Sequence, residues 1–260
     1  MKYKEIAVIS DIHSNAMSLE IVLKEILSKK IDLCIILGDL LTYGTQPNEV
    51  IELLFDFSNK INCIFIKGNH DQFYFDIQKK IDPIKYNIAE FVKESIFWTN
   101  DKLKYNLYEV FDWKDNFILD KVYFAHANPF EYGNWKYLND EKDILKAAGY
   151  LGKKGVKVGI FGHTHRNRKY IIEENSVNCI SSVINEFKFN DNRKLILNAG
   201  SIGQPRGSSP NYTTLKISNN SIICEDRNVV FDNKAVVKQI YSATLSIETK
   251  NELSSFWGIN

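Results

Sequence analysis

The sequence predicts an α/β fold built on two sheets, of which the first is largely parallel. Short apolar runs at residues 5–9, 31–37 and 62–67 alternate with amphipathic stretches, as in βαβ units whose helices cover a parallel sheet. Each of these runs ends in a loop that carries polar side chains, which is where open α/β sheets place their sites. Beyond residue 166, apolar and polar residues alternate over several short runs, a pattern typical of antiparallel strands.

The first quarter of the chain supplies three strands and two helices. Residues 5–9 are apolar after Glu5, the pattern of a strand that is buried on both faces. Residues 16–29 then place Leu19, Val22, Leu23, Ile26 and Leu27 at helical spacing. A second strand, a second helix and a third strand follow at residues 31–37, 47–57 and 62–67.

The rest of the chain predicts a helical stretch, a second sheet and a C-terminal extension. Residues 73–111 are mostly helical in pattern and rich in aromatic side chains. Two apolar strands are expected at residues 121–125 and 156–161. A second, more antiparallel sheet is expected from the alternating runs at residues 169–172, 195–198, 212–217 and 221–225.

Residues 232–260 predict one or two helices, and Thr249-Lys250-Asn251-Glu252 fits a capping box at a helix start. No internal repeat or flexible linker interrupts the chain. We therefore expect a single domain over residues 1–260, with residues 232–260 as a helical extension packed on it.

Composition excludes several classes of partner. The 33 basic and 32 acidic residues leave a net charge of +1, so neither stable nucleic-acid binding nor membrane-surface binding is expected. Four cysteines occupy strand-like surroundings without a C-x-x-C pair and are expected to be buried free thiols. The chain contains no signal-peptide pattern and no apolar stretch of membrane-spanning length, so we expect a cytoplasmic protein.

All five histidines lie in short loops that follow predicted strands, together with two aspartates and an asparagine. Because loops from neighbouring strands meet at one edge of the sheet, these side chains are expected to converge. The glycines at positions 38, 68 and 162 allow the backbone to approach closely just before a polar residue. The converging residues are Asp11, His13, Asp39, Asn69, His70, His126, His163 and His165.

Carboxylates and imidazoles without thiolates suit manganese, iron, zinc, nickel or cobalt rather than a structural zinc site. Seven candidate ligands among these eight residues are too many for one open metal site and are about right for two metals that share a carboxylate. Two metals at a separation of about 3.5–4 Å activate a water and clamp a phosphoryl oxygen. The chemistry expected is hydrolysis of a phosphorus–oxygen bond.

The ordered motifs resemble those of the calcineurin-like metallophosphoesterase superfamily, over about residues 5 to 207. They stand here as Asp11-Ile12-His13, Gly38-Asp39, Gly68-Asn69-His70-Asp71, the lone His126, and Gly162-His163-Thr164-His165. The resemblance implies a four-layer fold, a two-sheet β-sandwich flanked by helices. It further implies that Asp11, His13 and His165 hold one metal, that Asn69, His126 and His163 hold the other, and that Asp39 bridges the two.

By the same resemblance, His70 steadies the phosphoryl group and helps to protonate the leaving oxygen, and Asp71 orients His70. The Asp-Arg-Gly that follows Gly-Asp in serine/threonine protein phosphatases is missing after Asp39, and Asp71 replaces their usual Glu. Residues 43–49 and 198–206 instead look like the compact bacterial YfcE-type phosphoesterases. This branch implies phosphodiester or phosphomonoester substrates.

Outside the ligand set, Arg206 is a candidate for contacting a substrate phosphate, because arginine suits bidentate phosphate recognition. Asn15 is a second candidate, although it is equally well placed to cap the helix that starts beside it. Tyr43 either walls the site or packs. Trp135 and Tyr137 either stack on a nucleobase or belong to the core.

The leading hypothesis is a dinuclear phosphoesterase that uses a metal-bridging hydroxide to cleave a phosphodiester of a small substrate, with nucleotides among the candidates. The expected cofactors are two divalent ions, manganese first in assays, with iron, zinc, nickel or cobalt as alternatives. The alternative activities are those of a phosphomonoesterase or a nucleotide pyrophosphohydrolase. The alternative outside enzymes is a scaffold on the same fold.

Overall fold

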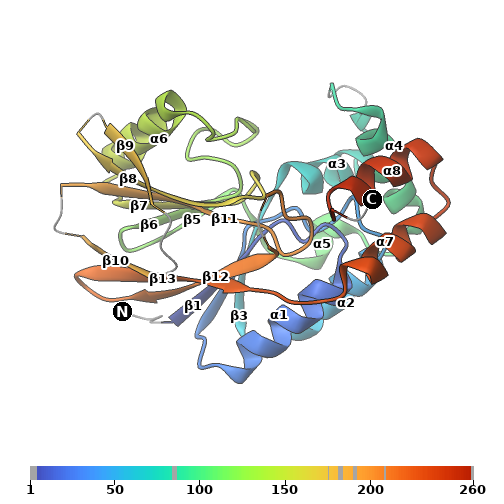
Figure 1. The fold of residues 1–260 in the computed structure, drawn as a ribbon, viewed down its shortest axis with the longest axis horizontal. Coiled ribbons are helices and arrows are strands. Elements are labelled where there is room, and N and C mark those ends of the chain that lie inside the picture. Colours follow the sequence, from blue (N-terminus) through green and yellow to red (C-terminus); the bar gives the residue numbers. More distant parts are fainter. Residues whose placement is uncertain are drawn as a thin grey trace.

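Two mixed sheets pack face to face, and helices cover their outer faces (Figure 1). The computed structural model describes residues 5–83, 87–174, 176–180, 184–189, 192–207 and 209–258. The predicted two-sheet sandwich flanked by helices is confirmed.

The first sheet has the strand order β10-β13-β12-β1-β2-β3-β4. Its centre is parallel, as the sequence predicts, because β1, β2 and β3 run in the same direction. Its strands are β1 (Glu5–Ile9), β2 (Leu33–Ile36), β3 (Asn62–Ile66), β4 (Trp113–Lys114), β10 (Ile184–Lys188), β12 (Asn211–Ile217) and β13 (Ser221–Asn228).

The second sheet has the order β5-β6-β7-β11-β8-β9, with β6, β7 and β11 parallel and the other pairs antiparallel. The expectation that residues 212–217 and 221–225 belong here was wrong, because β12 pairs with β1 of the first sheet. Alternation reveals a half-exposed strand but does not identify its partner. The strands are β5 (Asn116–Leu119), β6 (Val122–Ala125), β7 (Val158–Phe161), β8 (Asn167–Glu173), β9 (Ser176–Ile180) and β11 (Lys194–Ala199).

Three hydrophobic cores join four layers. Alternate side chains of β1 enter different cores: Ala7 and Ile9 face α1 (Ala16–Ser28) and α2 (Pro47–Ser58), and Ile6 and Val8 face the second sheet. Helix α6 (Glu141–Lys153) covers the other face of the second sheet, where Phe161 packs. A strand between two cores must be apolar on both faces, which explains the uninterrupted runs in the sequence.

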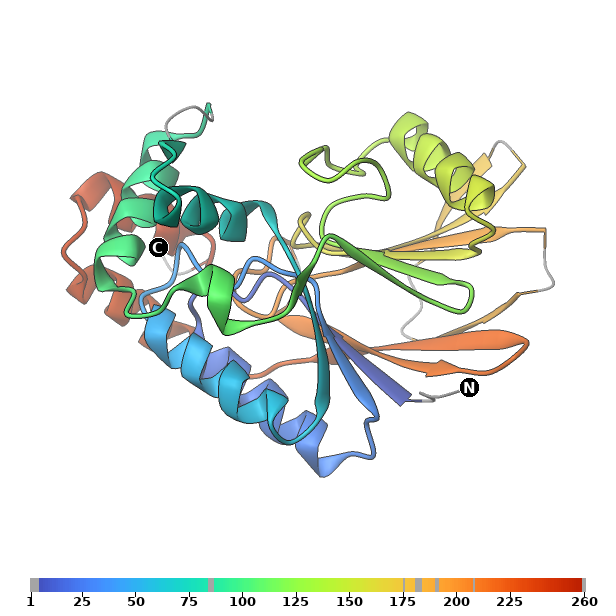
Figure 2. The ribbon, with the colours of Figure 1, turned by 180° about the vertical axis from the view of Figure 1, so that it is seen from behind.

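The remaining helices gather beyond the carboxyl ends of the central strands (Figures 1 and 2). Residues 73–111 are mostly helical, as predicted. Ser246 caps the last helix by accepting from the Thr249 N–H, so the expected capping box at Thr249 was placed one turn too late. The helices are α3 (Asn69–Gln78), α4 (Glu90–Lys102), α5 (Leu107–Val110), α7 (Asn233–Ser242) and α8 (Ile247–Ser255).

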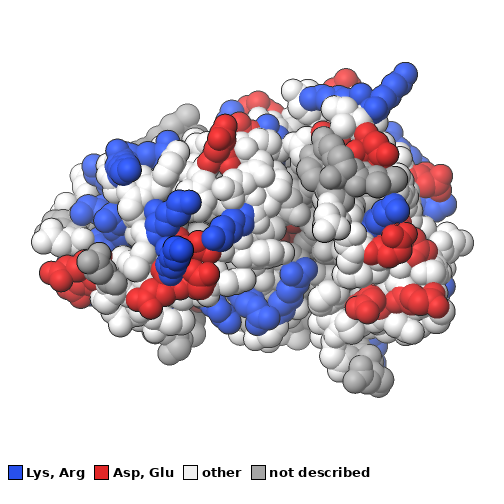
Figure 3. Space-filling model, turned by 90° about the horizontal axis from the view of Figure 1, so that it is seen from above, with Lys and Arg blue, Asp and Glu red and all other residues white. Residues whose placement is uncertain are grey.

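Three features of the structure bear on the expectations from composition. Basic and acidic side chains are interspersed on the face shown in Figure 3. Cys34 and Cys224 are buried as expected, whereas Cys179 is exposed because it lies on the edge strand β9, and Cys63 is half-buried. Among the described residues, no helix is long and apolar enough to cross a membrane.

Candidate metal centre and active site

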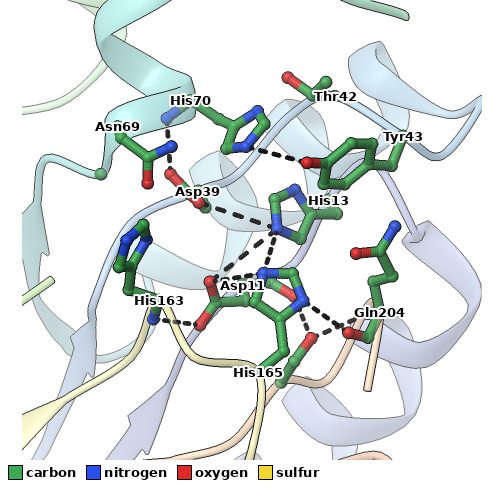
Figure 4. Close-up of polar contacts among 12 residues, drawn as sticks. Asp11, His13, Asp39, Thr42, Tyr43, Asn69, His70, His163, His165 and Gln204 are labelled. Atoms are coloured by element: carbon green, nitrogen blue, oxygen red, sulfur yellow. Dashed lines mark hydrogen bonds and ion pairs between the residues drawn. The ribbon is translucent and has the colours of Figure 1, made fainter. Parts of the chain in front are cut away.

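Five loops at the carboxyl ends of β1, β2, β3, β6 and β7 converge on one buried centre, of which Figure 4 shows a large part. The first three loops come from one sheet and the last two from the other, so the centre lies where the two sheets meet. All seven sequence-predicted ligands lie here, and all except the half-buried Asn69 are buried. They are Asp11, His13, Asp39, Asn69, His126, His163 and His165.

The backbone at these loops is strained. The φ angles of Asp11, His13, Asp39, His163 and His165 are 53°, 47°, 54°, 63° and 55°, in the left-handed region that side chains with a Cβ rarely adopt. Hydrogen bonds between loops hold this geometry, among them Asp11 N–H to the Gly38 carbonyl at 3.1 Å. Strain of this kind persists where the surrounding fold fixes it, and it is concentrated at functional sites.

Two glycines let the loops come this close. A Cβ at Gly68 would lie 2.1 Å from Asp39 Oδ1, and one at Gly162 would lie 1.9 Å from Ser10 Oγ. Neither position tolerates a side chain without moving a metal-ligand loop. The predicted close approach at these positions is confirmed.

Asp11, His13, Asp39 and His165 form a first ligand group, whose candidate ligand atoms all lie within 4.8 Å of one another. The Nε2 atoms of His13 and His165 are 3.1 Å apart, and Asp11 Oδ1 is 3.2 Å from His165 Nε2. Ligands bound at about 2.1 Å from a cation lie roughly 3–3.5 Å from one another. The spacing of this group therefore suits a divalent cation.

Asp39, His126 and His163 form a second ligand group. His126 Nε2 lies 3.3 Å from Asp39 Oδ2 and 3.1 Å from Asn69 Oδ1, so the Asn69 amide adds an oxygen ligand. Asp39 belongs to both groups, the position that a bridging carboxylate requires.

Backbone carbonyls orient the four ligand imidazoles. The Nδ1 atoms of His13, His126 and His165 each donate to a carbonyl, which leaves the Nε2 lone pair directed into the centre. His163 is reversed: its Nε2 donates to a carbonyl and leaves Nδ1 for a ligand. The accepting carbonyls belong to Leu41 (3.0 Å), Leu37 (2.6 Å), Gln204 (2.6 Å) and Trp135 (2.8 Å), respectively. Sequence reasoning missed these four residues because a carbonyl carries no side-chain signal.

The residues present fit a bound cation. With both Nδ1 atoms donating, the Nε2 lone pairs of two neutral rings, His13 and His165, face each other at 3.1 Å, and a cation or a proton on one ring relieves their repulsion. Asp11 Oδ1 and Asp39 Oδ2 are buried and accept no hydrogen bond within the described part of the chain. Buried carboxylate oxygens without donors are costly, and metal ions would satisfy both of them.

Protonation favours metal binding at Asp11, Asp39, His13 and His163. His126 is the exception: burial lowers its pKa, but the Asp39 carboxylate raises the pKa to about 9, so this ring must lose a proton when a cation binds. Burial would raise the pKa values of the Asp11 and Asp39 carboxyls, but the nearby His165 and His126 hold both well below the usual range. Burial and the neighbouring His126 lower the pKa of His163 to about 3. Burial, with a further contribution from His165, lowers that of His13. Neutral imidazoles and ionised carboxylates are the forms that bind metals.

His70 faces the centre from the start of α3 and is not part of either ligand group. Its Nε2 lies 3.2 Å from the Tyr43 hydroxyl, and its Nδ1 is buried without a partner among the described residues (Figure 4). Burial lowers the pKa of His70 to about 4, against the opposing charge of Asp39. Tyr43 is buried at 7% exposure and walls the site, so both alternatives considered for it hold.

Asp71 does not orient the His70 ring, contrary to the role that the resemblance implied. Its carboxylate accepts from the backbone N–H groups of Asp39 (2.8 Å), Leu40 (3.0 Å) and Gly68 (2.8 Å). Asp71 thus ties the second ligand loop to the third. Burial, with the charge of Asp39, raises its pKa to about 7 in spite of these three bonds.

The two proposed substrate contacts differ. Asn15 caps α1, with Oδ1 accepting from the Ser18 N–H at 3.1 Å and Nδ2 donating to the Gly203 carbonyl at 3.2 Å. Its amide is therefore engaged by the protein, and the capping alternative is the one the structure supports. Arg206 is half-buried and lies beside the Tyr43 hydroxyl, at the edge of the centre.

An aromatic loop covers the second ligand group. The Tyr137 ring stacks on His163 at 4.1 Å between centroids, and the Trp135 ring meets the His126 ring edge-on at 6.0 Å. Asn128 holds the loop by donating to the carbonyls of Asn134 and Lys136. Neither aromatic ring belongs to the hydrophobic cores of the described residues, so the core alternative is not supported for Trp135 or Tyr137.

Comparison with known proteins agrees with this geometry. Residues 4–167 match the sequence model of the calcineurin-like phosphoesterase. An uncharacterized protein of Methanocaldococcus jannaschii, MJ0912, is 33% identical over 210 residues, which cover 77% of each chain.

Two solved structures match nearly the whole chain. A metallophosphoesterase from Sphaerobacter thermophilus has a TM-score of 0.73 at 21% identity and covers 98% of this chain and 99% of its own. Hypothetical protein PH1004 from Pyrococcus horikoshii has a TM-score of 0.74 at 17% identity, with coverages of 96% and 97%. The family depends on two metal ions, and both ligand groups are present here. The chain belongs to the calcineurin-like phosphoesterase family.

Proposed function

We propose that this protein is a dinuclear metal-dependent phosphoesterase that hydrolyses a phosphodiester of a small substrate. The observation that carries the proposal is Asp39, which is shared by two buried ligand groups. Asp11, His13, Asp39 and His165 would hold one cation, and Asp39, Asn69, His126 and His163 the other. Two bound cations would supply a water of lowered pKa and positive charge beside the phosphoryl oxygens.

The remaining residues act on the substrate. Arg206 would bind a non-bridging phosphoryl oxygen through its guanidinium, whose geometry suits phosphate. His70 would donate an N–H to the phosphoryl group or to the leaving oxygen. The negative charge of a bound phosphoryl group raises the pKa of a buried imidazole, which makes protonated His70 available for the leaving oxygen.

The test is hydrolysis of bis-p-nitrophenyl phosphate beside p-nitrophenyl phosphate, with metal-stripped protein to which Mn²⁺, Fe²⁺, Zn²⁺, Ni²⁺ or Co²⁺ is returned. Asp39→Asn removes the shared carboxylate. Asp32→Asn is the matched control, because it also replaces a carboxylate with an amide. Asp32 lies near the opposite end of β1, where it accepts from the Glu5 N–H.

We expect metal-dependent cleavage of the diester, which is lost in Asp39→Asn and kept in Asp32→Asn. Turnover of the monoester alone would replace the diester proposal with a phosphomonoesterase. If neither substrate reacts, a dinucleoside polyphosphate tests the pyrophosphohydrolase alternative. If the dinucleoside polyphosphate is not hydrolysed with any of these metals, the catalytic proposal is refuted and the scaffold alternative takes its place.

A further inference from the structure

The C-terminal segment reaches the active site through one aromatic side chain. Phe256 follows α8 directly, and its half-buried ring lies 6.4 Å from the Tyr43 ring. The Arg206 guanidinium carbon lies 5.4 Å from the centroid of the same ring. Phe256 therefore contacts two residues that line the metal centre, although it is about 50 residues beyond the last of them in sequence.

The Arg206 guanidinium has few partners of its own. One Nη2 donor goes to Gln204 Oε1 at 3.2 Å, and Nε is buried without an acceptor in the described part of the chain. Burial raises the pKa of Tyr43, and the nearby Arg206 opposes that rise; the Tyr43 hydroxyl in turn lies 3.2 Å from His70 Nε2. The Phe256 ring thus contacts an arginine that has a buried, unused Nε donor and that neighbours Tyr43, the hydrogen-bond partner of His70.

Helix α4 fixes the segment that carries Phe256. The Glu94 carboxylate accepts from the Ser246 N–H (2.6 Å), the Ser246 hydroxyl (2.5 Å) and the Thr249 hydroxyl. The Trp98 indole donates to the Thr244 hydroxyl at 3.0 Å. The same helix holds Tyr43, whose backbone N–H donates to Ser95 Oγ at 2.8 Å. Helix α4 therefore anchors both the segment of Phe256 and the backbone of Tyr43, the two aromatic neighbours of Arg206.

We propose that Phe256 is a positioning residue of the active site, whose ring holds the Arg206 guanidinium beside Tyr43 and His70 so that it engages the phosphoryl group. The inference deepens the proposed function and rests on it. It makes Phe256 part of the substrate site, whereas the rest of the C-terminal segment serves to place this ring. A cation over an aromatic face is attracted by the negative charge of that face, and leucine of similar size lacks this attraction.

The test compares Phe256→Leu, Phe256→Trp and Arg206→Ala, alone and combined, with Ile247→Ala as control. Ile247 begins α8 and is 56% exposed, so its truncation tests the helix without touching the site. The readouts are KM and kcat for bis-p-nitrophenyl phosphate, the dissociation constant of orthophosphate by calorimetry on the manganese-loaded protein, and the melting temperature.

We expect Phe256→Leu to raise both KM and the orthophosphate dissociation constant by about 3-fold, with kcat and the melting temperature nearly unchanged. Phe256→Trp should keep KM and the orthophosphate dissociation constant near their wild-type values, because tryptophan also presents an aromatic face. Phe256→Leu should have no further effect on Arg206→Ala, because residues that act as one unit are not additive. Ile247→Ala should match the wild type.

The inference would be overturned if Phe256→Leu raised KM and the orthophosphate dissociation constant equally in the wild type and in Arg206→Ala. It would also be overturned if Phe256→Leu changed neither constant in either protein. If orthophosphate binding weakened in every variant, Ile247→Ala included, in proportion to the fall in melting temperature, the effect would be one of stability and the inference would also be overturned. If the wild type binds orthophosphate but cleaves no ester, the proposed function fails, and the binding data still decide the role of Phe256. A wild type that binds no orthophosphate refutes the positioning role.

Discussion

Asp71 shows how a single buried carboxylate organises the metal centre without contacting a metal ligand's side chain. It accepts three backbone N–H bonds from two ligand loops and so fixes the positions of Asp39 and of the third loop relative to each other. Because Asp39 is shared by both ligand groups, its position affects both metals. The geometry of the centre thus depends on groups outside the ligand set.

Asp71→Asn should therefore weaken metal binding although no ligand is removed. An amide presents N–H toward at least one of the three backbone N–H groups, and that group then loses its acceptor. We expect manganese affinity to fall by about 10- to 100-fold, as when other groups that orient ligands are altered. Titration of the metal-stripped protein with Mn²⁺ measures this, with Asp32→Asn as control, and an unchanged affinity would refute the role.

At this scale the sequence predicted which residues are brought together but not how they are held. All candidate ligands are close together because strand-end loops must meet at one edge. The carbonyls of Leu37, Leu41 and Trp135 that set the ring orientations were not predictable, because any residue supplies a carbonyl. For the same reason the role of Asp71 was missed, since its partners are backbone amides.

Among the elements, α8 depends on one long-range anchor. The Glu94 carboxylate binds the cap residue Ser246 and the first-turn residue Thr249, so it satisfies the start of α8 from a different helix. Burial raises the pKa of Glu94, but the hydrogen bonds from Ser246 and Thr249 outweigh it, and the pKa falls below its ordinary value of 4.5.

Glu94→Gln should lower the free energy of unfolding by about 1–2 kcal/mol at pH 7, because the charge-assisted hydrogen bonds from Ser246 and Thr249 become weaker bonds to a neutral amide. A folded-state pKa below the unfolded value means that the stabilisation is present above pH 4.5 and is lost as the pH falls through the folded value. Urea denaturation of both proteins at several pH values tests this. A difference that is constant from pH 7 to pH 4 would contradict it.

The elements of the first half were predicted closely, because strands buried on both faces and amphipathic helices have distinct periods. Two errors came from tertiary partners. The pairing of β12 with β1 joins residues about 200 apart, and no local pattern encodes it. The cap of α8 was predicted three residues too late, since Ser246 and Thr249 are both good cap residues and the sequence does not show that the Ser246 hydroxyl accepts from the Thr249 N–H.

Across the whole molecule, the two sheets are joined by an ion pair as well as by apolar packing. Lys169 of β8 in the second sheet binds Asp226 of β13 in the first, with 2.6 Å between Nζ and Oδ2. The lysine side chain is only 2% exposed. Removal of the Asp226 carboxylate takes away a counter-charge that lies 2.6 Å from this buried ammonium group.

Asp226→Asn should destabilise the protein by about 3 kcal/mol, since breaking one side of a buried pair is costly. Lys169→Met combined with Asp226→Asn should recover much of that loss, because the double variant no longer buries an ammonium group that has lost the Asp226 carboxylate. Urea denaturation of the single and double variants measures both values. A double variant less stable than Asp226→Asn would contradict this account of the pair.

The central claim is that one centre binds two metals through a shared Asp39. The most direct measurement is anomalous diffraction from a crystal of the manganese-loaded protein. We predict two peaks about 3.5–4 Å apart, one beside Asp11, His13 and His165, the other beside Asn69, His126 and His163, with Asp39 touching both. A single peak, or two peaks that do not share Asp39, would contradict the claim.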